Sequence, residues 1–194
     1  MDTYKDLPVL FFEDLKGWVQ WLETSYDQSK GVWLQFAKKG SGILSLTYEE
    51  AREGAIRYGW IDGLKNGYDA TYYLLRFTPR CPKSVWSKIN REIAESLIAE
   101  NKMAPAGLRE VVAAQKDGRW ERAYDSPSTI TVPADFQQAL EQNPQALQFF
   151  NGLNKANRYS FLYRLQTAKK PETRLANIAK FITMLAASRA FHAE

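Results

Sequence analysis

The sequence predicts an α+β fold, in which a small antiparallel sheet of about three strands with helices is followed by an all-helical C-terminal part. Apolar residues alternate in residues 31–38 and 60–77, as in half-buried strands, and recur with helical spacing through residues 84–190. At 194 residues, the chain is long enough for one domain or two small ones. We expect an α+β part over residues 1–125 and a helical part over residues 134–194 packed on it, either as two domains or as one unit.

The predicted N-terminal part begins with a helix, a strand and a second helix. Residues 13–26 form the first helix, because their apolar side chains fall on one face. The strand over residues 31–38 follows. Thr47 and Glu50 have the spacing of a capping box, which starts the second helix, and Gly59 is the residue type that ends a helix in the left-handed conformation.

A β-hairpin over residues 60–77 completes the predicted sheet. Its turn is expected at Asn66-Gly67, because both positions tolerate the positive φ angles of a two-residue hairpin loop. Such a loop places Asp62 opposite Thr71 in the neighbouring strand.

Helices are predicted from residue 84 onward, and prolines mark where several of them begin, since proline suits the first turn of a helix. Asp117-Gly118 closes one helix, and the loop at residues 125–133 is the expected boundary between the two parts. The expected C-terminal helices cover residues 134–142, 145–153, 158–168 and the segment that begins at Pro171.

The composition excludes several classes of site. Cys81 is the one cysteine and His192 the one histidine, so a disulfide framework and a multi-thiolate metal site are ruled out. No nucleotide-binding or hydrolase motif occurs, and we expect neither a metal nor a cofactor. No secretion signal or membrane-spanning run is visible, which favours the cytoplasm.

Several short motifs stand in a specific order along the chain. They are Tyr58-Gly59-Trp60-Ile61-Asp62-Gly63, Arg76-Phe77-Thr78-Pro79-Arg80, Ser84-Val85-Trp86-Ser87-Lys88-Ile89-Asn90, Gly118-Arg119-Trp120, Ala123-Tyr124, Phe149-Phe150, Leu153, Arg158, Ala168-Lys169 and Thr173-Arg174. Together they resemble the YdeI/OmpD-associated family, also called bacteriocin-protection proteins. The resemblance extends over residues 13–190 and implies a cytoplasmic bacterial protein linked to stress or bacteriocin tolerance, with no catalytic set to carry over. Arg57 stands where the family often has a cysteine, which counts against thiol chemistry at that position.

Charged and aromatic residues of these motifs are the candidate binding site, at the border between sheet and helices. Asp62 follows Trp60 by two residues on one strand face, beside apolar neighbours, where a carboxylate needs a donor. We expect it to accept a hydrogen bond from the basic segment that follows, through Arg80, Ser84, Ser87, Lys88 or Arg119. The candidate ligand-binding residues are Trp60, Asp62, Arg80, Trp86, Lys88 and Arg119. The same residues also suit a purely structural salt bridge, helix caps and packing.

The segment 151–189 is strongly basic, with eight Lys and Arg residues and a single acid, Glu172. Such a segment attracts anions or a phosphate backbone, although a solvated helix face has the same composition. We predict a non-catalytic protein that binds a small anionic or zwitterionic ligand or a peptide. The alternatives are nucleic-acid association through the basic C-terminal helices and a hydrolase-like enzyme that uses Asp62.

Overall fold

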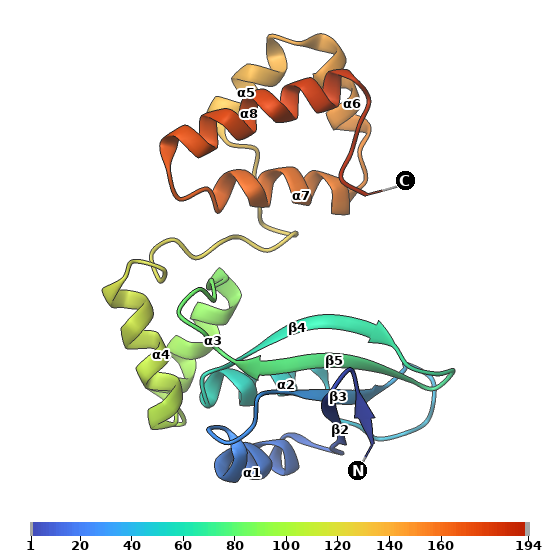
Figure 1. Cartoon of the computed structure of the whole chain (residues 1–194), viewed down its shortest axis with the longest axis vertical. Coiled ribbons are helices and arrows are strands. Elements are labelled where there is room, and N and C mark those ends of the chain that lie inside the picture. Colours follow the sequence, from blue (N-terminus) through green and yellow to red (C-terminus); the bar gives the residue numbers. More distant parts are fainter. Residues whose placement is uncertain (1, 193–194) are drawn as a thin grey trace. The chain divides into compact units, whose positions relative to one another are not determined.

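In the computed structural model, which describes residues 2–192, the chain divides into two compact units. The N-terminal unit contains the chain up to Trp86 together with Asn90–Glu121, and the C-terminal unit contains Ser87–Ile89 and the chain from Arg122 onward. Figure 1 shows that the strands belong to the first unit and that helices make up most of the second. The predicted α+β class is therefore confirmed.

The sheet of the N-terminal unit has five strands in the order β1-β2-β3-β5-β4. The prediction of about three antiparallel strands was wrong on two counts. The sheet gains two short N-terminal strands, and one of them, β2, runs parallel to β3. These strands were missed because their few apolar residues show no clear alternation and are interrupted by a turn at Lys5 and Asp6, both with positive φ. The strands are β1 (Thr3–Tyr4), β2 (Leu7–Phe11), β3 (Val32–Ala37), β4 (Trp60–Gly67) and β5 (Tyr72–Pro79).

The hairpin of β4 and β5 exists, but its turn and register differ from the prediction. Asn66 and Gly67 lie within β4, and the chain reverses at residues 68–71. The carboxylate of Asp69 accepts hydrogen bonds of 2.7 Å from the backbone N–H groups of Thr71 and Tyr72, and this turn outcompetes the Asn-Gly turn.

As a result of this turn and of an irregularity between Asp62 and Lys65, Asp62 pairs with Phe77 rather than with Thr71.

Helices α1 (Leu15–Ser25) and α2 (Tyr48–Arg57) pack with the sheet around an aromatic core. The capping box of Thr47 and Glu50 is present at the start of α2, as predicted. Gly54 allows the close approach of α1, because a Cβ at this position would lie 2.6 Å from the Trp18 ring. The largest buried side chains of this core are Trp18, Trp60, Phe36 and Phe77.

Two further helices, α3 (Lys88–Ala99) and α4 (Pro105–Lys116), complete this part of the chain. Helix α4 begins at the predicted proline and ends at Asp117, after which Gly118 takes φ +75°. A left-handed residue at this place ends the helix and turns the chain toward Arg119 and Trp120.

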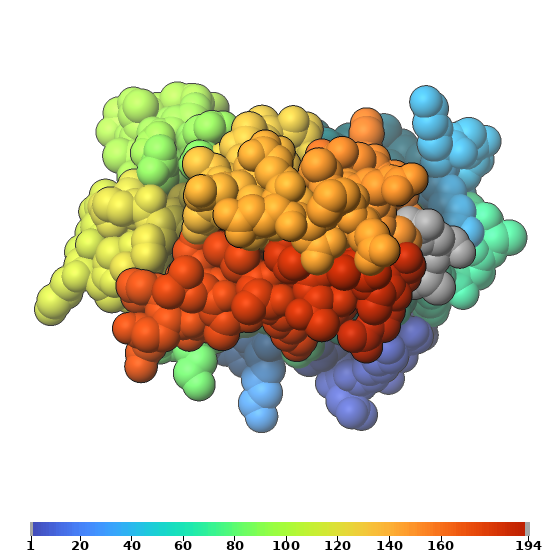
Figure 2. Space-filling view, turned by 90° about the horizontal axis from the view of Figure 1, so that it is seen from above, coloured from blue at the N-terminus to red at the C-terminus, as the bar shows by residue number. Residues whose placement is uncertain are grey.

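In its described residues, the C-terminal unit contains the four helices α5 to α8 around a phenylalanine core. Its first helix begins after Pro133 as predicted, whereas α7 begins earlier than predicted, because the Asn154 side chain caps it by accepting from the Asn157 N–H. The helices are α5 (Ala134–Glu141), α6 (Pro144–Gly152), α7 (Lys155–Gln166) and α8 (Pro171–Ala186). The space-filling view shows α8, in red, along the orange helices that precede it (Figure 2).

The C-terminal unit is not purely helical, since a parallel β-bridge joins Ser87 to Tyr124. None of the helices within residues 2–192 combines the length and the apolar composition that crossing a membrane requires.

Candidate functional site

The six residues predicted to bind a ligand are divided between the two units, five in the N-terminal unit and Lys88 in the C-terminal unit. Each is engaged in contacts within its own unit. Trp60 and Asp62 lie on β4, Arg80 and Trp86 lie before α3, and Arg119 follows α4. The prediction that they bind a ligand therefore stays a prediction, and their contacts show what else they do.

Trp60 is a core residue. Its side chain is 1% exposed, and its ring packs edge-on against Trp18 and Trp21 at centroid distances of 6.2 and 5.7 Å. The indole Nε1 donates a hydrogen bond of 3.0 Å to the carbonyl of Tyr26, at the end of α1. This contact satisfies the buried donor and ties the helix to the sheet.

Asp62 has a different partner from those predicted. Its carboxylate accepts a hydrogen bond of 2.9 Å from the hydroxyl of Tyr48, in the first turn of α2. Tyr48 lies outside the basic segment after the hairpin, where the partner of Asp62 was predicted, and it reaches Asp62 because α2 packs directly on β4. Burial, and then the nearby Asp62 charge, raise the pKa of Tyr48 to about 12, so this phenol stays neutral and donates.

Arg80 and Trp86 are stacked on each other. The guanidinium carbon of Arg80 lies 3.7 Å from the centroid of the Trp86 ring, a close cation–π contact. Nη1 of Arg80 donates to the Val85 carbonyl at 3.3 Å. Trp86 packs in turn on Trp120, with ring centroids 4.9 Å apart. Arg80 is 7% exposed and Trp86 is 1% exposed, so this stack is buried.

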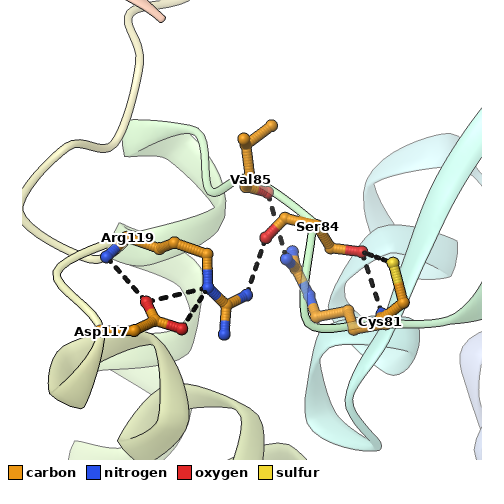
Figure 3. Close-up of polar contacts among 6 residues, drawn as sticks. Cys81, Ser84, Val85, Asp117 and Arg119 are labelled. Atoms are coloured by element: carbon orange, nitrogen blue, oxygen red, sulfur yellow. Dashed lines mark hydrogen bonds and ion pairs between the residues drawn. The ribbon is translucent and has the colours of Figure 1, made fainter. Parts of the chain in front are cut away.

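Arg119 holds the same loop from the other side (Figure 3). Its Nε donates to both carboxylate oxygens of Asp117 at 2.8 and 2.9 Å, and its Nη1 donates to the Ser84 carbonyl at 2.8 Å. Arg80 and Arg119 thus bind successive carbonyls, those of Val85 and Ser84. This pair of buried arginines fixes the path of the chain before α3.

Cys81 lies in a tight turn of the same loop. The Ser84 Oγ accepts from the Cys81 N–H at 3.0 Å and lies 3.4 Å from its Sγ. The hydrogen bond from Ser84, and then that from the Lys83 backbone, lower the pKa of this exposed thiol.

Lys88 belongs to the C-terminal unit and forms an ion pair there. Its Nζ lies 2.7 Å from Oδ1 of Asp125, whose other oxygen accepts a hydrogen bond of 2.6 Å from Gln166. Burial favours the neutral acid, but the hydrogen bonds from Lys88 and Gln166 outweigh it and keep the pKa of Asp125 below its ordinary value. Through these contacts, Asp125 anchors the chain segment that precedes α5 onto α7.

An open site of the C-terminal unit is a basic pocket, which sequence reasoning anticipated only as a charged segment. It has a volume of about 650 Å³ and lies between the end of α7 and the first three turns of α8. Among the described residues, 2–192, no acidic side chain lines it. Its cationic residues are Arg164, Lys169, Lys170 and Lys180.

The cations of the basic pocket differ in how firmly they are placed. Arg164 is held by a hydrogen bond of 2.7 Å from Nη1 to the Ser160 carbonyl and by the Phe191 ring, 3.9 Å from its guanidinium carbon. Lys169, Lys170 and Lys180 are exposed, and within residues 2–192 none of them has an ion-pair partner. Their charges remain accessible to a ligand.

The start of α8 adds backbone donors beside the basic pocket. Lys170 is its N-cap residue and makes no side-chain cap, and Pro171 occupies the first position. The next N–H groups have no partner within the helix, which favours an anion there. Thr173, in the same turn, lines the pocket.

The remaining basic residues of segment 151–189 are distributed elsewhere. Arg174 forms a two-bond ion pair with Asp135 at 2.7 and 2.8 Å. Lys155 and Arg158 line a different cavity, beside Tyr159. The segment is thus divided in the structure rather than presented as one charged face.

No group of three or more His, Cys, Asp and Glu side chains suited to a metal ion occurs in the part of the chain that the structure describes.

Comparison with protein families finds two matches along the chain. Residues 10–110 match the family described as a domain of unknown function (DUF8412), and residues 129–188 match the family described as Bacteriocin-protection, YdeI or OmpD-Associated. The resemblance identified from the motifs is confirmed for the second segment, whereas the motifs at residues 58–90 fall in the first. No curated protein and no solved structure matches the chain. The chain therefore belongs to the family of the DUF8412 domain, and its residues 129–188 are similar to the YdeI/OmpD-associated family.

Proposed function

We propose that this chain is a non-catalytic binding protein whose YdeI/OmpD-associated domain holds a small, multiply charged anion in the basic pocket. The observation that carries the proposal is the convergence of Arg164, Lys169, Lys170 and Lys180 on one cavity that no acidic side chain of residues 2–192 lines. Clustered cations without a counter-charge repel one another, and a bound anion relieves that repulsion.

The other residues of the pocket support a small organic or phosphate-bearing ligand. Its volume of about 650 Å³ lies within the range typical of small-molecule sites. Thr167, Thr173 and Asn177 supply neutral hydrogen-bonding groups that orient a ligand, and Phe181 and Phe191 form an apolar part of the wall. Arg164 is already positioned by Ser160 and Phe191, so less of its conformational entropy is lost when it binds a ligand.

The family description of residues 129–188 supports bacteriocin protection as the biological setting. We propose that anion binding is the molecular activity behind that role, and that it takes place in the cytoplasm, as the sequence suggests.

Isothermal titration calorimetry of the full chain with inorganic phosphate, pyrophosphate and citrate, at constant ionic strength, tests the proposal. Saturable binding that strengthens with ligand charge is expected. The double variant Lys169→Gln/Lys180→Gln should weaken it by about tenfold or more, because a hydrogen bond to a charged group contributes ~1.5–3 kcal/mol. The control Lys16→Gln/Lys30→Gln removes the same charge from exposed positions of the N-terminal unit and should leave the affinity unchanged.

Equal weakening by both double variants would mean that only net charge matters, and it would refute a specific pocket. Absence of small-anion binding, together with oligonucleotide binding that falls steeply with salt, would favour the nucleic-acid alternative instead. Hydrolysis of a bound phosphoanhydride would contradict the non-catalytic assignment.

A further inference from the structure

We propose a second binding site, in the N-terminal unit, for a small organic anion in which one carboxylate is attached to an apolar group. The site is a cavity of about 900 Å³ where the loop between β3 and α2 covers one end of the sheet. It lies in the DUF8412 segment and does not depend on the basic pocket of the C-terminal unit.

The floor of this cavity is a stack of aromatic rings. Phe36 of β3 and Tyr73 of β5 face each other with centroids 5.2 Å apart and planes within 13° of parallel. The Lys65 Nζ lies 4.1 Å from the Tyr73 centroid, so a cation is held directly at the apolar floor. Tyr48 of α2 also lines the cavity, and its hydroxyl is already committed to Asp62.

The covering loop is anchored at its ends and open in the middle. At its start, the Lys38 N–H donates to the Thr71 carbonyl at 2.8 Å. At its end, the Ser45 Oγ accepts from the Ala37 N–H at 3.1 Å, and the Leu46 N–H donates to the Phe12 carbonyl at 2.9 Å. Between these anchors, Ile43 lines the cavity while remaining 41% exposed, and Leu44 next to it is 73% exposed. An apolar ligand group would remove such surface from water, which is favourable.

The charges at the cavity select a monoanion. Lys39 and Lys65 line it without an ion-pair partner in the described part of the chain, whereas the Lys38 Nζ donates to the Asp69 carbonyl. Glu49 also lines the cavity and repels a ligand that carries several negative charges. The balance fits one carboxylate better than a phosphate.

The start of α2 does not supply the anion site. Its capping box is complete: the Glu50 N–H donates to the Thr47 Oγ1, and the Thr47 N–H donates to the Glu50 carboxylate. The Glu50 carboxylate thus already occupies the positive end of the helix. A bound carboxylate would depend on the lysines, and this is the feature that mutation can test.

The test uses ¹⁵N-labelled full chain titrated with 3-phenylpropionate and, in parallel, with the neutral 3-phenylpropionamide. We expect saturable chemical-shift changes at Ile43, Lys65 and Tyr73 with the acid. Lys39→Gln/Lys65→Gln should raise the dissociation constant at least fivefold, Ile43→Ser should raise it less, and the amide should bind at least fivefold more weakly than the acid.

The Lys169→Gln/Lys180→Gln variant is the matched control, since it changes the same charge in the other unit. It should bind 3-phenylpropionate like the unaltered chain, and Lys39→Gln/Lys65→Gln should bind pyrophosphate unchanged. Equal binding of acid and amide, no saturable shift at the three residues, or loss of 3-phenylpropionate binding in the control would overturn this second site. None of these results bears on phosphate binding by the basic pocket, so the two proposals fail separately.

Discussion

Two pairs of cationic side chains, one pair in each unit, are placed in opposite ways. In the N-terminal unit, Arg80 and Arg119 are each 7% exposed and are bound to carbonyls, a carboxylate or a tryptophan ring. In the C-terminal unit, Lys169 and Lys180 are exposed beside an open pocket. A buried cation needs partners within the chain, so that losing them is costly, whereas an exposed unpaired cation is available to a ligand.

The cores of the two units also differ in a way that experiments can use. All tryptophans belong to the N-terminal unit, whose core they dominate, whereas the C-terminal core is built from phenylalanines. Tryptophan fluorescence therefore reports on the first unit, and circular dichroism reports on the helices of both.

The largest effect is expected from Phe161→Ala in the C-terminal core. Phe161 is fully buried and packs against Phe181 and Phe191 at centroid distances of 5.1 and 4.7 Å. Its truncation should lower the free energy of unfolding by about 3–5 kcal/mol. In a urea titration, the circular dichroism signal should show an additional transition at low urea concentration. The tryptophan fluorescence transition should keep its midpoint. A common shift of both signals would show that the chain unfolds as one cooperative unit.

The next largest effect is expected from Arg119→Met, which removes the contacts to Asp117 and the Ser84 carbonyl while keeping an apolar stem. It should cost about 2–3 kcal/mol, as for lost hydrogen bonds to a buried charged group. In this variant, the tryptophan fluorescence transition should shift to a lower urea concentration. Arg109→Met, at an exposed position of α4, should change stability by less than about 0.5 kcal/mol. Equal effects of the two variants would contradict a stabilising role of the Arg119 contacts.

A smaller effect, of about 1 kcal/mol, is expected from Asp62→Asn, because the hydrogen bond from Tyr48 loses its charged acceptor. The folded-state pKa of Tyr48, about 12, lies above its ordinary value of 10.0. The neutral phenol thus contributes stability that is present below pH 10 and lost as the pH rises through about 12.

Spectrophotometric titration of Asp62→Asn should therefore show this tyrosine ionising at lower pH than in the unaltered chain. Part of the upward shift should persist, because burial is its largest cause. The exposed Asp27→Asn is the control, and a titration curve identical to the original in both variants would argue against the contact.

The smallest effect concerns the stability of the fold at acidic pH. The hydrogen bond from Arg174 is the main cause that lowers the pKa of Asp135 below its ordinary 3.8. A carboxyl group whose pKa is lowered in the folded state stabilises the fold above its ordinary pKa. This contribution is lost as the pH falls through the lower folded-state pKa.

Because the Asp135 side chain is 44% exposed, solvent screening limits this contribution to about 1 kcal/mol or less. Asp135→Asn should flatten the acid dependence of the C-terminal helical signal below pH 3.8 and leave the tryptophan signal unaffected. An unchanged acid profile would show that the pair contributes nothing.

Helix boundaries could be predicted well where a local signal acts alone. The Thr47–Glu50 capping box, Gly118 at the end of α4 and Pro171 at the start of α8 all do what their residue types favour. Each depends on hydrogen bonds or dihedral angles within a few residues of the chain, which the sequence contains.

Positions that depend on competition between local signals could not be predicted. Asn66-Gly67 is a strong turn signal, yet the turn forms around Asp69, where hydrogen bonds from the next backbone N–H groups combine with pairing of the strands. The choice between the two turns is made by the packing of the whole hairpin, because a shift in register moves side chains to the other face of the sheet.

The sequence by itself determined the α+β class, the absence of cysteine and histidine clusters, and the basic character of residues 151–189. Only the tertiary structure decided which charges are available. It placed Arg80 and Arg119 against carbonyls, paired the Asp62 carboxylate with the Tyr48 hydroxyl, and brought Lys169 and Lys180 to one pocket. The physical reason is that composition counts charges, whereas burial and the neighbours that folding supplies determine whether each charge is neutralised within the chain or remains accessible to a ligand.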